Sequence, residues 1–221
     1  MASVVGEQLR DLAARGLDFR VPRLHVLDGG KAVAAAVRQH AGGAAWIQRC
    51  QVHKRRNVLD HLPEEHKPSV KKKLQNAYAM AEYSDAKRAL ERLHRELMEL
   101  NPSAARSLED GMEETLTVHR LRVPAQLRRT LASTNVIESA FSIVETVCRN
   151  VKRWRTGDHI ERWVGSGLLV AECQFHKVQG YREIPALVTS MATAVSKKAV
   201  AEEVKVAGPC SRAPWGTPDN C

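Results

Sequence analysis

Two segments of this chain have the pattern of buried β-strands, and both lie within its first 50 residues. The first is Leu24–Leu27 and the second is the apolar run Ala44–Cys50. Between them, Lys31–His40 is rich in Ala and Val and is followed by Gly42-Gly43, a pattern typical of a helix and its end. A strand, a helix and a second strand in this order indicate a parallel βαβ unit.

The rest of the chain has helical periodicity. A helix is expected over Val4–Arg15, and residues 52–129 carry charged amphipathic helices without a strand pattern. Ser103 is expected to cap one of these helices. Two apolar stripes in this segment recur at helical spacing, and we assign them to core packing. They consist of Val70, Leu74, Ala77, Tyr78 and Ala81, and of Ala86, Leu90, Leu93, Leu97 and Leu100.

The predicted fold is therefore α/β in class and predominantly helical overall. We divide it into a βαβ segment (1–51), an all-helical insertion (52–129), a further helical segment (130–190) and a disordered tail (191–221). The end of the tail is rich in Gly, Pro, Ser and Asn, a composition that disfavours packed structure.

Charge and cysteine content limit the partners and the location that we expect. Lys and Arg outnumber Asp and Glu by 34 to 25, a net charge of +9, which favours a polyanion such as nucleic acid. Five cysteines without framework spacing indicate a reducing compartment. The most apolar run, Val164–Ala171, is too short to span a bilayer, and the start of the chain lacks a signal-peptide pattern. We expect a cytoplasmic protein without membrane association.

Asp28 and Glu138 are the candidate catalytic and metal-binding carboxylates. Asp28 follows the first strand and precedes Gly29-Gly30, where a carboxylate is well placed to hold a hard cation such as Mg²⁺. Ordinary turn chemistry also explains an Asp before Gly. Glu138 lies three residues after Asn135, so a capping box is its alternative role. A strand-end Asp and a helix-borne Glu on either side of a helical insertion can converge on shared metal ions.

Cys50 and His53 form a C-x-x-H pair after the second strand. As half of a zinc site the pair lacks a second pair at finger spacing, although His61 and His66 lie nearby. A structural role at the strand end, with contact to DNA, is the alternative that we favour.

Basic residues form clusters that suit DNA binding. The segment around Arg149–Arg155 contains no acid and includes Trp154, and cations beside an aromatic face suit phosphate neutralisation and base stacking. The alternative to DNA contact is that Trp154 and Trp163 pack in the core, with the aliphatic parts of arginine side chains lying over them. The predicted DNA-contacting residues are His53, Lys54, Arg55, Arg56, Arg149, Lys152, Arg153, Trp154 and Arg155.

Several separated motifs resemble those of the mutator-type transposases of bacterial insertion sequences. The similarity extends from Val4 to about Leu187. It rests on the segments LHVLDGGKA, QRCQVHKRRNVLDHLP, STNVIES, VKRWRTGDHIERWVGSGLLVAE and FHKVQGY.

This resemblance implies a fold, a chemistry and a set of partners. The fold is a ribonuclease-H-like core with an all-helical insertion between its second and third acidic residues, so 1–51 and 130–190 would be parts of that core. Asp28 would be the second acid, Glu138 the third, and Cys50 with His53 the family's C-x-x-H signature. Mg²⁺, with Mn²⁺ as an alternative, would be the cofactor. DNA at transposon ends and targets would be the partner, and the enzyme a homo-oligomer.

The sequence also departs from the family pattern. The family's first catalytic Asp lies upstream of this region, and Glu7, Asp11 and Asp18 match no family motif. Glu145 stands where a basic residue is common. We therefore expect this chain to correspond to the carboxyl-terminal part of such a transposase. Two hypotheses follow, a transposase that cuts and joins DNA and a non-catalytic DNA-binding remnant. A helical interaction protein is a third reading, which leaves the βαβ opening and the placement of the acids unexplained.

Overall fold

The protein is described by a computed structural model over residues 2–206. Its sheet consists of β1 (Arg23–Leu27) and β2 (Ala45–Arg49), which are parallel and paired from Arg23 with Ala45 to Leu27 with Arg49. The connection contains α2 (Lys31–Ala41) and the short 3-10 helix η1 (Gly42–Ala44). The predicted parallel βαβ unit is confirmed. The two-stranded sheet does not confirm the predicted partial ribonuclease-H-like core, which stays a prediction.

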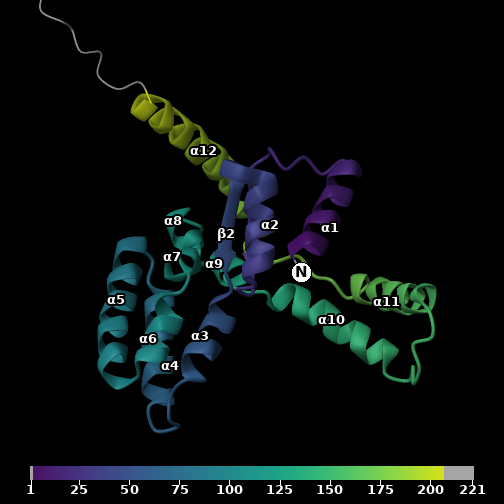
Figure 1. Ribbon diagram of the computed structural model, residues 1–221, viewed down its shortest axis with the longest axis horizontal. Coiled ribbons are helices and arrows are strands. Elements are labelled where there is room, and N and C mark those ends of the chain that lie inside the picture. Colours follow the sequence, from purple (N-terminus) through teal and green to yellow (C-terminus); the bar gives the residue numbers. More distant parts are fainter. Residues whose placement is uncertain (1, 207–221) are drawn as a thin grey trace, which may run out of the picture.

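The sheet lies between two groups of helices (Figure 1). Helices α3 to α6 stand together on one side, and the pair α10 and α11 extends on the other. The first group contains α3 (Gln51–Leu59), α4 (Lys67–Ala79), α5 (Tyr83–Leu100) and α6 (Pro102–Glu109). The second contains α10 (Asn135–Cys148) and α11 (Gly157–Glu172). Helix α1 (Ala2–Ala14) packs against α2.

A first hydrophobic core joins the helices of residues 58–116. The two predicted apolar stripes are buried in it, apart from Ala81, which is exposed beyond the end of α4, and Leu100, which is exposed at the end of α5. Asn101 rather than Ser103 caps α6, because the Asn101 side chain accepts hydrogen bonds from the backbone N–H groups of Ser103 and Ala104 at 2.9 and 3.1 Å. Leu90, Leu97 and Leu108 are fully buried, so these helices support one another.

A second core joins the sheet to distant parts of the chain. Trp46 of β2 packs with residues of α8 (Thr117–Arg120), α9 (Ala125–Leu131) and α12 (Ile184–Val206). The short helices α7 (Met112–Thr115) and η2 (Tyr181–Glu183) precede α8 and α12, respectively. Residues from all four predicted segments meet in this core. The segment boundaries themselves stay predictions.

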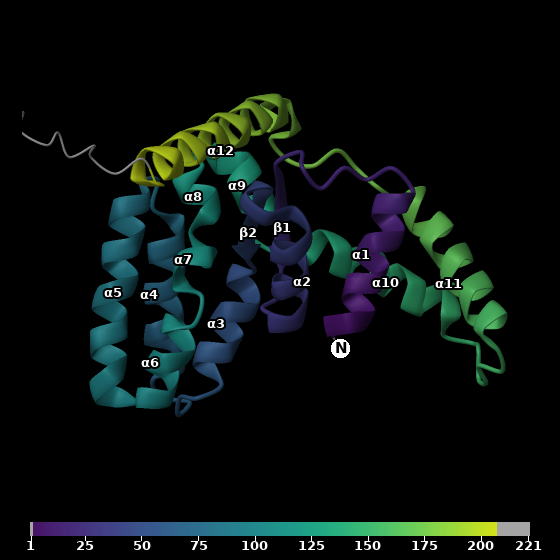
Figure 2. The ribbon, with the colours of Figure 1, turned by 45° about the horizontal axis from the view of Figure 1, so that its top comes forward.

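Helix α12 corrects the predicted tail. It runs to Val206 and lies across the end of the sheet (Figure 2), so residues 191–206 are helical rather than disordered. Leu187 and Met191 are buried in the second core, and the Ala, Glu and Lys residues that follow favour helix. Residues 207–221 of the predicted tail lie outside the described residues.

Candidate functional site at the carboxyl edge of the sheet

Asp28 lies at the carboxyl end of β1 with an exposed side chain. Its Oδ1 accepts a hydrogen bond from the Gly30 backbone N–H at 3.0 Å. Gly29 between them has a φ of 118°, which disfavours other residues. Asp28 therefore closes the turn that leads into α2, as ordinary turn chemistry predicts. Its carboxyl group is still exposed to solvent.

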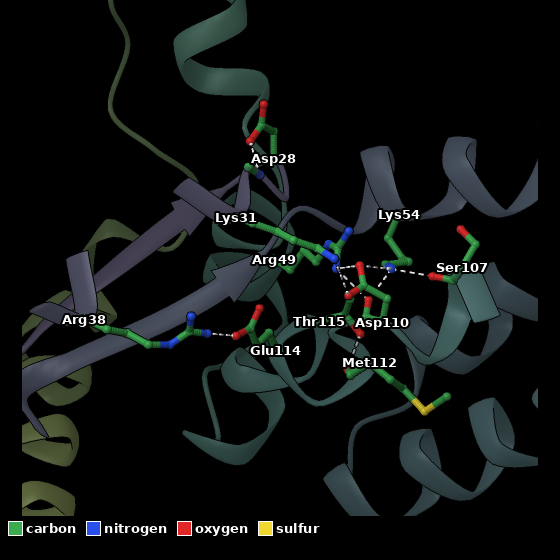
Figure 3. Close-up of polar contacts among 11 residues, drawn as sticks. Asp28, Lys31, Arg38, Arg49, Lys54, Ser107, Asp110, Met112, Glu114 and Thr115 are labelled. Carbon is green, nitrogen blue, oxygen red and sulfur yellow. Dashed lines mark hydrogen bonds and ion pairs between the residues drawn. The ribbon is translucent and has the colours of Figure 1, made fainter. Parts of the chain in front are cut away.

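Arg49 supports this turn from the neighbouring strand (Figure 3). A Cβ added to Gly29 would lie 2.8 Å from Arg49 Nε, so the guanidinium packs directly against the turn. Arg49 Nη1 donates to the backbone oxygen of Asp110 at 2.6 Å and to its Oδ2 at 2.7 Å. This guanidinium holds the pKa of Asp110 below its ordinary value. The loop between α6 and α7 is thereby tied to the Asp28 turn.

Lys54 belongs to the same cluster and corrects a prediction. Its side chain is 1% exposed, and its Nζ donates to the backbone oxygens of Ser107 and Asp110. Burial lowers its pKa to about 8. Lys54 therefore stabilises the loop between α6 and α7, and the prediction that it contacts DNA is wrong, because its charged group faces inward.

Glu138 lies in the first turn of α10 with an exposed side chain. Thr134, which precedes the helix, donates its hydroxyl to Glu138 Oε1. His53 Nδ1 lies 3.7 Å from the same oxygen. The alternative capping box with Asn135 as N-cap is wrong, since Asn135 is already the first helical residue and Thr134 occupies the cap position. The Glu138 carboxyl group is held by side chains instead.

The C-x-x-H pair connects the Glu138 helix to the sheet. Cys50 is fully buried, its Sγ accepts a hydrogen bond from the backbone N–H of Thr134 at 3.4 Å, and Thr134 Oγ1 lies 3.4 Å from the same sulfur. His53 Nδ1 lies 3.3 Å from both Cys50 Sγ and Thr134 Oγ1. The Cys50 backbone N–H donates to the oxygen of Leu27 at 2.7 Å. A continuous set of contacts therefore leads from the residue before Asp28 to Glu138.

The two carboxylates suit Mg²⁺ in chemical type. Carboxylate oxygens are the ligands that Mg²⁺ prefers, and one or two of them suffice when water and substrate phosphate complete the coordination. Asp28 commits Oδ1 to its turn and Glu138 commits Oε1 to Thr134. Within residues 2–206, no three His, Cys, Asp or Glu side chains gather in a way that would hold a metal ion. A closed site, such as structural zinc at Cys50 and His53, is therefore not formed by the described residues, and an open Mg²⁺ site would depend on substrate.

The basic segment between α10 and α11 is exposed. Arg149, Lys152, Arg153 and Arg155 are all exposed, and Arg56 is exposed on α3 while Arg55 and His53 are half-buried. Trp154 and Trp163 are 44% and 37% exposed, so the alternative in which both are core residues is wrong. Their rings flank His159, with ring centroids 6.1 and 6.5 Å from it. A cleft of about 780 Å³ is lined by His159 and Trp163 and by four basic residues, namely Lys152, Arg153, Arg155 and Arg162.

Both carboxylates lie in the part of the chain that matches the sequence model of one protein family. The sequence model described as Transposase, Mutator family, matches residues 5–173, which is more than half of the chain and includes Asp28, Cys50, His53 and Glu138. The chain belongs to the Mutator family of transposases.

Curated proteins that are similar to this chain are transposases of insertion sequences. The chain is 36% identical over 138 residues to the transposase for insertion sequence element IST2 of Acidithiobacillus ferrooxidans, covering 62% of this chain and 45% of that protein. It is 35% identical over 124 residues to the transposase for element ISRM5 of Rhizobium meliloti, covering 56% and 30%. Identity to the transposase for element IS256 in transposon Tn4001 of Staphylococcus aureus is 27% over 134 residues, covering 60% and 32%. The chain thus spans less than half the length of each of these transposases.

Several residues that shape this candidate site were not found by sequence reasoning. Gln48 is fully buried, and its side chain contacts the backbone of Thr115 and Val118 at 2.8 and 2.9 Å. It joins β2 to α7 and α8, as Arg49 joins β2 to Asp110. A polar Gln-Arg pair at the end of an apolar run is the one signal in the sequence that points to these two residues.

No helix of residues 2–206 has the length and apolarity needed to cross a membrane.

Proposed function

We propose that this chain acts in transposition of an insertion sequence, with Asp28 and Glu138 as catalytic carboxylates that cut and join DNA phosphodiesters. The observation that carries the proposal is the series of contacts that links the Asp28 turn to Glu138. Both carboxylates are exposed, and contacts through Leu27, Cys50 and Thr134 hold them at the same edge of the parallel sheet. The family membership and the insertion-sequence relatives support it.

The chain's own groups would divide the work. Asp28 and Glu138 would hold Mg²⁺ or Mn²⁺, which when bound supplies Lewis-acid polarisation of a phosphodiester. Two-metal chemistry, with water and then a DNA 3′-hydroxyl as nucleophiles, requires further ligands beyond this pair. Cys50, His53 and Thr134 would fix the orientation of Glu138 without touching the substrate.

Exposed cations would bind the DNA strand. Phosphate neutralisation by Lys and Arg supplies most of the affinity of non-specific DNA binding. Arg149, Lys152, Arg153 and Arg155 are available for this role, and Trp154 offers a face for stacking. Assembly into a homo-oligomer stays a prediction.

A second candidate function is DNA binding without catalysis. It is favoured by one observation, namely that the described residues bring no third carboxylate, histidine or cysteine into a metal-binding group with Asp28 or Glu138. The basic surface does not depend on those carboxylates, so binding would persist without cleavage.

Cleavage of DNA by the complete 221-residue chain distinguishes the two. We would incubate the chain with supercoiled plasmid and Mg²⁺ or Mn²⁺, and compare wild type with Asp28→Asn, Glu138→Gln and Glu145→Gln. Glu145 is an exposed residue of the same helix as Glu138 and serves as the matched control. Metal-dependent nicking that is lost in the first two variants and kept in the third supports the catalytic function. Nicking that persists in Asp28→Asn contradicts it, and binding without nicking by wild type supports the second candidate.

A further inference from the structure

A cleft of about 510 Å³ lies between α3, α4 and α9, beside the start of α10. Three arginines line it, and no acidic residue does. Arg55 comes from α3, while Arg128 and Arg129 come from α9, more than 70 residues later in the chain. The remaining lining residues are Gln51, Val52, Gln75, Tyr78, Ala79, Ala125, Ala132, Ser133 and Asn135.

The three guanidinium groups have no carboxylate partner in the described part of the chain. No ion pair within residues 2–206 involves Arg55, Arg128 or Arg129. Arg128 donates from Nη1 to the backbone oxygen of Ala81 at 3.0 Å, which fixes its place but leaves its charge uncompensated. Like charges gathered on a concave surface raise the local potential and attract an anion.

Two other clefts of the molecule contain acidic residues beside their cations. The cleft of about 300 Å³ beneath the Asp28 turn is also lined by Lys31, Arg38 and Arg49, yet Asp110 and Glu114 pair with all three cations (Figure 3). A cleft of about 630 Å³ along α5 contains Glu91, Glu109, Glu113 and Glu114. Lys31, Arg38 and Arg49 in the first of these clefts, and Lys87 in the second, are therefore paired with carboxylates, whereas no such pair involves the arginines of the arginine cleft in residues 2–206.

The arginine cleft is continuous with the candidate catalytic edge. Gln51 and Asn135 line the cleft. Gln51 directly follows Cys50, and Asn135 directly follows Thr134. Cys50 and Thr134 contact each other, and Thr134 also holds Glu138. The backbone N–H of Gln51 donates to the oxygen of Ala132 at 2.8 Å, so the wall of the cleft and the Glu138 helix are joined. An extended anion in the cleft would run toward the carboxylates.

We propose that this arginine cleft binds the sugar–phosphate backbone of the DNA strand on which the carboxylates act. Arg55, Arg128 and Arg129 contact its phosphates, and Gln75, Ser133 and Asn135 add neutral polar contacts. Guanidinium groups match phosphate oxygens in geometry as well as in charge. The inference rests on the proposed function and extends it, because Arg128, Arg129 and Gln75 lie outside the predicted DNA-contacting set and in a different part of the molecule from the Arg149–Arg155 segment.

A charge-matched pair of double variants tests the proposal in the complete chain. Arg55→Gln with Arg129→Gln removes two charges from the cleft at side chains that make no described hydrogen bond or ion pair. Arg92→Gln with Arg95→Gln removes two exposed charges from α5 and is the control. Affinity for a labelled DNA duplex is measured by fluorescence anisotropy across a range of salt, after equal melting temperatures have shown that both variants fold.

We expect the cleft variant to bind DNA about tenfold more weakly at about 0.1 M salt, with a logarithmic salt slope shallower by about 2. The control should retain nearly the wild-type affinity and slope. Equal losses in the two double variants, or no loss in the cleft variant, overturn the proposal. Complete displacement of the DNA by millimolar inorganic phosphate at constant ionic strength also overturns it, because the cleft would then be a small-anion site.

Failure of this proposal and failure of the proposed function give different results. If wild type does not bind DNA at all, the proposed function fails and takes the cleft assignment with it. If wild type binds DNA and the cleft variant binds equally well, the cleft assignment alone fails.

Discussion

The contact between Arg49 and Asp110 joins the end of β2 to the loop between α6 and α7, beneath the Asp28 turn. One guanidinium nitrogen of Arg49 donates to both the backbone oxygen and the carboxylate of Asp110, at 2.6 and 2.7 Å. The Arg49 side chain is 10% exposed, whereas that of Asp110 is 46% exposed. The pair thus spans the boundary between interior and solvent, and it fixes the loop after α6 against the sheet.

Replacing Arg49 by Met should destabilise the fold by about 2 kcal/mol, because two charge-assisted hydrogen bonds are lost while the apolar stem is kept. The free energy of unfolding, measured by urea denaturation, checks this. Arg15→Met removes an exposed pair with Asp11 and should change stability much less. Equal losses in the two variants would show that the Arg49–Asp110 contact is unimportant for stability.

Lys54 should make stability depend on alkaline pH. Its pKa is lowered by burial to about 8 in the folded chain, from an ordinary value of 10.5. Between these values the unfolded chain binds the extra proton, so the Lys54 contribution to stability rises with pH across this window. The full change is on the order of 3 kcal/mol.

Urea denaturation of wild type and Lys54→Met between pH 7 and about 10 tests this. The difference in stability between the two proteins should shift in favour of wild type as pH rises. Lys72→Met, at an exposed position of α4, is the control and should show no such trend. A pH-independent difference for Lys54→Met would contradict the prediction.

The extent to which sequence predicted this molecule depends on how local each feature is. The strands, the amphipathic stripes such as Leu90 to Leu97, and the exposed strand-end Asp28 follow from periodicity and turn residues within short windows. The burial of Lys54 does not, because it depends on the backbone oxygens of Ser107 and Asp110, more than 50 positions away. A run of basic residues, considered without its tertiary contacts, is expected to be exposed to solvent.

The candidate site divides in the same way. Asp28 and Glu138 were proposed from the sequence because a strand-end Asp and a helix-borne Glu lie on either side of a helical insertion and match the motifs of one family, although each has an ordinary turn or capping role when considered alone. Thr134 was missed, although it contacts Cys50, His53 and Glu138. Its role comes from tertiary contact between α3 and α10, which no local pattern records. The arginine cleft was missed for the same reason, since Arg55 and Arg128 meet only in the folded chain.

Thr134→Val should weaken the junction between the C-x-x-H pair and α10. The hydroxyl donates to Glu138 and lies 3.3 Å from His53 Nδ1, so its loss should cost about 1 kcal/mol of unfolding free energy. Thr146→Val on the same helix removes only a hydroxyl contact to the Ser142 backbone oxygen and is the matched control. Chemical denaturation of both variants decides. A loss confined to Thr146→Val would refute the role assigned to Thr134.

Two glycines of α11 should respond to the same substitution with opposite signs. A Cβ at Gly167 would lie 3.0 Å from Val144 Cα and 3.1 Å from Val144 Cγ1, whereas a Cβ at Gly165 would meet nothing within 4 Å. Gly167→Ala should therefore force α10 and α11 apart and destabilise the protein by about 1–2 kcal/mol. Gly165→Ala removes backbone freedom from the unfolded chain and should stabilise it by about 0.5–1 kcal/mol. Melting temperatures of the two variants against wild type give the signs directly. A shift in the same direction for both would mean that close contact at Gly167 does not hold the pair together, and α11 would then be placed against α10 by its side chains alone.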